Sequence, residues 1–92
     1  MLRLTTTATD SGPTVVAAHG WIGGDDLPLL KQELEELLQQ ESPVVLELSA
    51  VRAIDPAGLA SLSRWLEMGL KLRGGSAFVR TLLRAHGHED PA

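Results

Sequence analysis

The chain has 92 residues, of which 43% are hydrophobic, and this predicts one small domain, residues 1–92, with a single hydrophobic core. Twelve acidic and eight basic residues give a formal charge of −4 without a basic cluster, which argues against nucleic acid as the main partner. The absence of cysteine excludes disulfides and thiolate metal sites. No apolar run approaches the ~18 residues of a membrane span and the N-terminus lacks a signal-peptide core, so we expect a soluble, cytoplasmic protein.

The first part of the chain predicts a β-hairpin followed by an amphipathic helix. Residues 2–7 alternate weakly and are rich in threonine, as in an edge strand, and a turn at residues 10–13 leads to a second strand at 14–19. Three glycines then predict a loop that contains Trp21 and Ile22. A helix is expected to start after two candidate N-caps, Asp25 and Asp26. It is expected to end near residue 40, because apolar side chains recur every three or four positions up to there: Leu27, Leu30, Leu34, Leu37 and Leu38.

The central stretch, residues 43–59, predicts a strand, a short turn and a second helix. Residues 43–48 form an apolar, β-branched run of the kind found in strands that are buried on both faces. Asp55 before Pro56 is typical of a helix start, with Asp55 as the N-cap and Pro56 at the first helical position. Gly58 favours a close approach of this helix to the sheet.

The last part predicts the end of that helix, a short strand and a third helix. Leucines at positions 59, 62 and 66 form the apolar face of the second helix, and Gly69 is its expected end. Residues 70–73 alternate as a strand, and Ser76 is a candidate cap for the last helix. The alternative is that the second helix continues to Arg73 and that residues 76–80 form the last strand. The polar residues 86–92 are expected to be a disordered tail.

The preferred order is β-β-α-β-α-β-α. Alternation of strands and helices predicts helices packed on a mostly parallel sheet, and the leading hairpin makes that sheet mixed. The predicted class is therefore α/β, with four strands and about three helices.

The central stretch resembles the signature of the STAS domain family, which includes the anti-sigma factor antagonists and related domains of sulfate transporters. The family's strand leads through a loop into an Asp-Ser-x-Gly-Leu helix start, and here that start is Asp55-Pro56-Ala57-Gly58-Leu59. The likeness extends to the segments 19–22 and 72–79 and so covers nearly the whole chain. It implies a non-catalytic bacterial domain of partner switching and transcription regulation, which binds a protein partner without a cofactor.

One residue departs from the pattern of the antagonists. They carry a serine or threonine after the aspartate, and its phosphorylation by an anti-sigma kinase releases the antagonist. Pro56 has no hydroxyl, so we expect no phosphorylation there. Ser61 and Ser63 lie further along the helix and are no obvious substitutes.

Several side chains are candidates for partner contact, and each has a structural alternative. Asp55 could contact a partner, but capping alone explains it, and Pro56 could simply stabilise the helix start. Trp65 lies off the predicted apolar face and could anchor a partner or pack over a loop. The same two roles are open to Trp21. The expected partner surface comprises Asp55, Pro56, Ala57, Gly58, Ser61, Trp65 and Trp21.

Catalysis and metal binding are not expected. His86 and His88 have metal-like spacing with Glu89 and Asp90, but within the predicted tail. His19 stands alone on a strand, the Gly-Gly pairs lack the context of a P-loop, and no serine is paired with an evident base and orienting group.

Three functions remain open. The first is an antagonist-like regulator that binds a kinase-type anti-sigma factor or a larger signalling complex. The second is a cytoplasmic accessory subunit of a lipid or sulfate transporter, without insertion into the membrane. The third is a sensor of nucleotides or small apolar ligands. The sequence leaves the oligomeric state open, a homodimer included.

Overall fold

The computed structural model describes residues 2–8, 12–40 and 43–85, and Phe78 by its backbone alone. Within these ranges the chain forms four strands, one 3₁₀ turn and three α-helices. Their order is β1 (Leu2–Thr7), β2 (Thr14–Ile22), η1 (Gly24–Asp26), α1 (Leu27–Leu38), β3 (Val44–Ile54), α2 (Pro56–Glu67), β4 (Lys71–Arg73) and α3 (Ala77–Ala85). This order confirms the preferred prediction.

The strands form one sheet in the order β1-β2-β3-β4. β1 pairs antiparallel with β2, while the β2–β3 and β3–β4 pairs are parallel. The predicted mixed, mostly parallel sheet and the α/β class are therefore confirmed, and β1 is an edge strand as expected.

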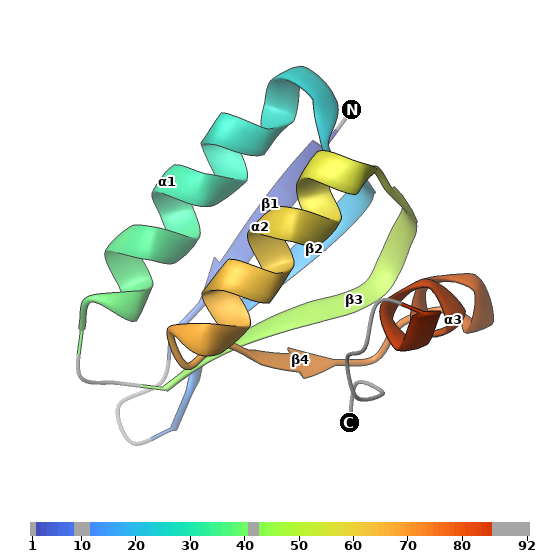
Figure 1. The fold of residues 1–92 in the computed structure, drawn as a ribbon. Coiled ribbons are helices and arrows are strands. Elements are labelled where there is room, and N and C mark those ends of the chain that lie inside the picture. Colours follow the sequence, from blue (N-terminus) through green and yellow to red (C-terminus); the bar gives the residue numbers. More distant parts are fainter. Residues whose placement is uncertain (1, 9–11, 41–42, 86–92) are drawn as a thin grey trace.

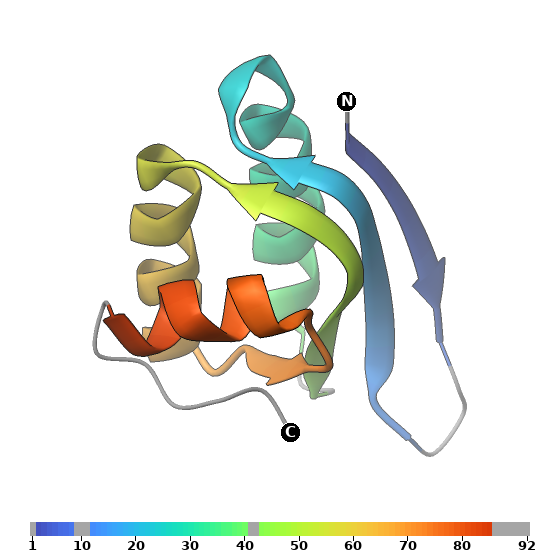
Figure 2. The ribbon, with the colours of Figure 1, turned by 90° about the vertical axis from the view of Figure 1, so that its right-hand side faces the viewer.

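The three helices lie on one side of the sheet, where α1 and α2 run side by side and α3 lies crosswise near β4 (Figures 1 and 2). The side chains of alternate strand residues, among them Val16 and Leu46, are fully buried under these helices. On the other face Val45 and Glu47 are half-buried and His19 is exposed. The prediction that the strand at 43–48 is buried on both faces is therefore wrong, because helices cover only one face.

Both central strands are longer than predicted. β2 continues to Ile22 and β3 to Ile54, so the expected turn after Leu48 and the expected loop position of Trp21 are wrong. The two strands are long because they pair with each other through backbone hydrogen bonds up to Ile22 and Ile54. The pairing register shifts twice along the way. The connection after β2 begins only at Gly23 and leads directly into η1.

Asp26, which was predicted to cap α1, instead connects the start of this helix to β1. Asp26 occupies the N-cap position, but its carboxylate makes no capping bond and instead accepts a 3.0 Å hydrogen bond from the backbone N–H of Leu2. The Thr6 hydroxyl donates to Glu33 of α1, also at 3.0 Å. The helix was predicted correctly and the capping role of Asp26 was not, because its partner lies 24 residues away.

Local signals near the C-terminus were predicted correctly. Gly69 adopts a φ of 105° just after α2, as expected for the residue that ends a helix. Ser76 Oγ accepts a 3.2 Å hydrogen bond from the backbone N–H of Val79 and caps α3, so the alternative with a strand at 76–80 is excluded. The predicted tail, 86–92, and the first half of the turn at 10–13 lie outside the described residues.

Among the described helices, none combines the length and the apolar character that crossing a membrane would require.

Candidate docking surface

Asp55 joins two segments at the end of the central strands. Its backbone is extended (φ −83°, ψ 171°), and its Oδ1 accepts a 2.7 Å hydrogen bond from the N–H of Gly58, which confirms the predicted N-cap. Its second oxygen, Oδ2, accepts a 2.9 Å hydrogen bond from the N–H of Gly24 in η1. One carboxylate therefore holds the start of α2 against the connection that follows β2.

The connection after β2 needs glycine at this point. Gly23 is buried with a φ of +146°, and a Cβ at this residue would collide with the carboxylate of Asp55. Gly24, with a φ of +59°, lies beside the ring of Trp21: a Cβ there would be 3.4 Å from Cη2 of the indole. The Trp21 ring thus lies beside Gly24, whose N–H is hydrogen-bonded to the Asp55 carboxylate.

Gly58 allows α2 to begin directly against β2, as the sequence predicted. A Cβ at this buried residue would lie 2.6 Å from the carbonyl oxygen of Ile22, which already accepts a 3.0 Å hydrogen bond from the N–H of Asp55. Because Gly58 is buried, it shapes the surface above it without forming part of that surface.

The exposed residues at this junction form what we call the α2-start surface: Trp21, Gly24, Asp25, Pro56 and Ala57. The Trp21 side chain is large and aromatic, yet 45% of it is exposed. Ser61, one turn along α2, is half-buried. Three of the predicted partner residues, Trp21, Pro56 and Ala57, therefore belong to this surface, and the half-buried Asp55 lies beneath it. Gly24 and Asp25 also belong to it, and sequence reasoning missed both.

Trp65 does not belong to this surface. Its side chain is 1% exposed, and its indole Nε1 donates a 3.1 Å hydrogen bond to Glu35 Oε2 of α1. The prediction that Trp65 lies off the apolar face was wrong, since the buried stripe of α2 runs along Gly58, Leu59, Leu62 and Trp65 while Leu66 is only half-buried. The spacing of positions 58, 62 and 65 is the signal that would have placed Trp65 inside.

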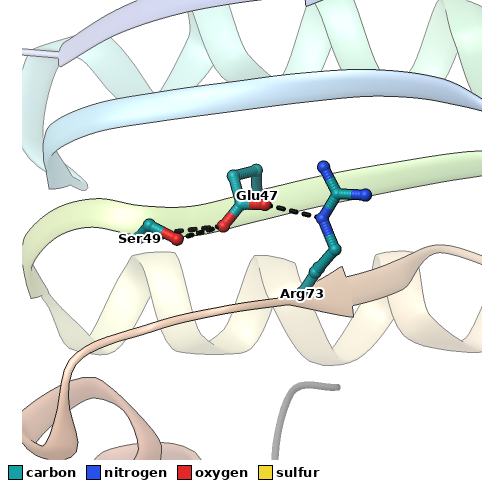
Figure 3. Close-up of polar contacts among 3 residues, drawn as sticks. All are labelled: Glu47, Ser49 and Arg73. Carbon is teal, nitrogen blue, oxygen red and sulfur yellow. Dashed lines mark hydrogen bonds and ion pairs between the residues drawn. The ribbon is translucent and has the colours of Figure 1, made fainter.

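A second polar group lies on the uncovered sheet face, away from the α2-start surface (Figure 3). Glu47 of β3 accepts hydrogen bonds from the Ser49 hydroxyl, from the Ser49 N–H at 3.2 Å and from Arg73 Nε of β4 at 2.6 Å. The bond from the Ser49 hydroxyl and then that from Arg73 lower the pKa of Glu47. The sequence pattern gave no sign of this group, because it depends on the register that places Glu47 opposite Arg73.

This group fastens β3 to β4. A serine beside a carboxylate could suggest an activated nucleophile, but a carboxylate whose pKa is lowered by the hydrogen bonds from Ser49 and Arg73 accepts a proton poorly and is a weak general base. Among the residues that the structure describes, no three histidine, cysteine or acidic side chains are grouped so that they could hold a metal ion. The tail histidines, His86 and His88, lie outside that part of the chain.

Several solved structures, two of which follow, resemble the fold described above. An anti-sigma factor antagonist from Mycobacterium paratuberculosis has a TM-score of 0.82 and 24% identity, over 95% of this chain and 79% of that one. An uncharacterized protein with a SpoIIAA-like fold, from Shewanella loihica, has a TM-score of 0.59 and 13% identity, over 96% of this chain and 82% of that one. At these identities the likeness concerns the fold.

Sequence comparison identifies the family. No curated protein matches the chain. A family model described as "Mlab, STAS domain" matches residues 5–90, nearly the whole chain. The resemblance of the central stretch to STAS domains is thereby confirmed, and the chain belongs to the STAS domain family.

Proposed function

We propose that the protein is a non-catalytic interaction domain that binds a regulatory protein through the α2-start surface. The observation that carries this proposal is the geometry around Asp55: its carboxylate joins the start of α2, where Pro56 and Ala57 are exposed, to Gly24, beside the exposed ring of Trp21. Exposed aromatic side chains are enriched at the energetic centres of interfaces. A surface that is already ordered loses little conformational entropy on binding, which favours affinity.

Binding is expected to be independent of phosphorylation at the usual site of the family. Pro56 is exposed at the first position of α2 and offers no hydroxyl. Ser61 and Ser63 are half-buried, and the Ser63 hydroxyl donates to the Leu59 carbonyl oxygen at 3.2 Å. Control would therefore come from protein concentration or from competition between partners.

The first candidate partner is a kinase-type anti-sigma factor, in keeping with the structural likeness to an antagonist. The second candidate function is that of a cytoplasmic accessory subunit of a membrane transporter. The observation that favours it is the match to a STAS family model, since STAS domains include domains of sulfate transporters as well as antagonists. Both candidates use the same docking surface and differ in the protein that it binds.

Affinity capture from the extract of the native host tests the proposal. We expect the wild-type chain to retain one specific protein and Ala57→Glu to retain less than about a tenth of it, because the longer, charged side chain would occupy the space of the apolar partner group that packs on Ala57 and would lose its hydration there. The fold should persist, since Ala57 is exposed and an acidic residue in the first turn of a helix is favourable. Mass spectrometry identifies the retained protein.

The matched control is Ala77→Glu, the same change at the exposed start of α3, which should retain as much partner as wild type. A kinase-type anti-sigma factor among the retained proteins supports the first candidate, and a transporter subunit the second. Equal retention by wild type and Ala57→Glu would contradict the proposal.

The captured wild-type chain itself should carry no phosphate, and Pro56→Ser is the positive control for phosphorylation. Phosphate on Ser61 or Ser63 of the wild-type chain would contradict phosphorylation-independent binding.

A further inference from the structure

The α2-start surface carries a charge of one sign. Among its five residues the charged one is Asp25. The two segments that build it, residues 20–30 and 53–63, also contain Asp26 and Asp55, and the basic residues Lys31, Arg52 and Arg64 directly flank these segments. Asp26 and Asp55 accept hydrogen bonds from backbone N–H groups, so their charges are partly compensated. The Asp25 side chain is exposed and makes no hydrogen bond or ion pair within the described part of the chain. The uncompensated charge of the surface is therefore that of Asp25.

Trp21 and Asp25 flank the same residue. The indole lies beside Gly24, and Asp25 follows Gly24 directly in η1. The face of an indole attracts cations, and a carboxylate accepts charge-assisted hydrogen bonds from arginine or lysine. An aromatic ring that lies beside Gly24 and a carboxylate on the next residue thus suit a single basic side chain.

We propose that the protein bound at the α2-start surface presents an arginine or lysine to Trp21 and Asp25, next to an apolar group that packs on Pro56 and Ala57. This inference rests on the function proposed above and names the chemistry of the partner. The negative sign of the surface and the exposed ring both select a basic partner over an acidic one.

Asp55 acts in this arrangement as a positioning residue. Its Oδ2 accepts the hydrogen bond from the N–H of Gly24 and so fixes the residue against which the Trp21 indole lies. An asparagine at position 55 can still cap α2 through its carbonyl oxygen, but its NH₂ group cannot accept a hydrogen bond from Gly24. Asp55→Asn therefore separates the positioning role from the capping role.

The positioning role is tested without a partner. The chain has two tryptophans, so its ¹H–¹⁵N spectrum has two indole signals, which Trp21→Phe assigns. In Asp55→Asn we expect the Trp21 signal to shift while the Trp65 signal, from the indole bonded to Glu35, stays in place and reports an intact fold. An unshifted Trp21 signal in a folded Asp55→Asn protein would overturn the positioning role.

The partner chemistry is tested by titrating the purified chain with the protein identified by capture. We expect affinity to fall about 5-fold for Asp25→Asn, more than 10-fold for Asp25→Lys and at least 10-fold for Trp21→Ala. Wild-type affinity should fall as salt is raised, and Asp25→Asn should reduce that dependence. Glu36→Lys, an equal charge change on α1, and Met68→Ala, the loss of another exposed apolar side chain, are the controls and should bind as wild type.

The outcomes separate the two proposals. Loss of binding in Ala57→Glu with wild-type affinity in Asp25→Lys and Trp21→Ala would overturn the basic partner and leave the docking surface standing. Equal binding by Ala57→Glu and wild type would overturn the docking surface itself. Capture of a second copy of this chain alone would replace the regulatory partner by self-association and would overturn both.

Discussion

Trp65→Ala is expected to lower the free energy of unfolding by about 3–5 kcal/mol, the usual cost of truncating a buried aromatic residue. The side chain is 1% exposed and is the largest of the fully buried ones in the core. It also holds α2 to α1 through its hydrogen bond to Glu35. A domain of this size has a total stability of roughly 5–14 kcal/mol, so the variant would lose a large share of it.

Urea denaturation followed by far-UV circular dichroism measures this effect. Trp65→Phe keeps most of the buried ring and should lose about 1–2 kcal/mol, from the missing hydrogen bond and the smaller volume. Trp21→Ala removes the same side chain from an exposed position, 45% accessible, and should change stability by no more than about 0.5 kcal/mol. If Trp21→Ala and Trp65→Ala had similar costs, the assignment of one tryptophan to the core and the other to the surface would be wrong.

Gly58→Val is expected to cost about 3 kcal/mol, at the upper end of the range for overpacked sites. Its Cβ would lie 2.6 Å from the carbonyl oxygen of Ile22 and 3.1 Å from the Cγ2 atom of Ile54. The backbone of β2 cannot retreat without weakening the hydrogen bond that this carbonyl accepts from Asp55. Replacing glycine by valine inside a helix normally gains about 0.3 kcal/mol through helix propensity, so a loss of stability would have to come from the close approach.

The matched control for Gly58→Val is Ala60→Val, which introduces the same side chain two residues further along α2 at an exposed position. Its cost should stay below about 1 kcal/mol, the helix-propensity difference of valine. Thermal unfolding of the two variants compares them directly. A Gly58→Val protein as stable as Ala60→Val would show that α2 does not approach β2 as closely as the fold requires.

Features that depend on neighbouring residues could be predicted from the sequence. Asp55 before Pro56 marks the start of α2, Gly69 its end, and Ser76 the start of α3, because capping chemistry acts over three or four residues. The strand–helix order followed from these signals together with the hydrophobic periodicity, and it determined the fold class.

Features that depend on distant partners could not be predicted. The second hydrogen bond of Asp55 reaches Gly24, 31 residues away, and Asp26 turns from its own helix to the N–H of Leu2. The extension of β3 to Ile54 likewise exists because β2 is long enough to pair with it. Sequence spacing contains no information about these contacts, although they are the ones that assemble the α2-start surface.

The error at Trp65 has a different cause. The apolar face of α2 was drawn through Leu59, Leu62 and Leu66, whereas the buried stripe also takes in Gly58 and Trp65. A glycine adds nothing to a hydrophobic pattern, so the side of the helix that faces β2 was underestimated. The position of Gly58, where the helix touches the sheet, indicates the direction in which that stripe points.

Amide hydrogen exchange of the free chain and of its complex with the captured protein tests the docking surface most directly. In the free chain, the N–H groups of Gly24 and Gly58 should already exchange slowly because Asp55 accepts their hydrogen bonds. On binding, we expect protection to rise at residues 21–25 and 57–61 and to stay unchanged in β1 and β4. Protection that rises on β1 or β4 and stays unchanged around Asp55 would contradict the account, because the partner would then occupy the uncovered face of the sheet.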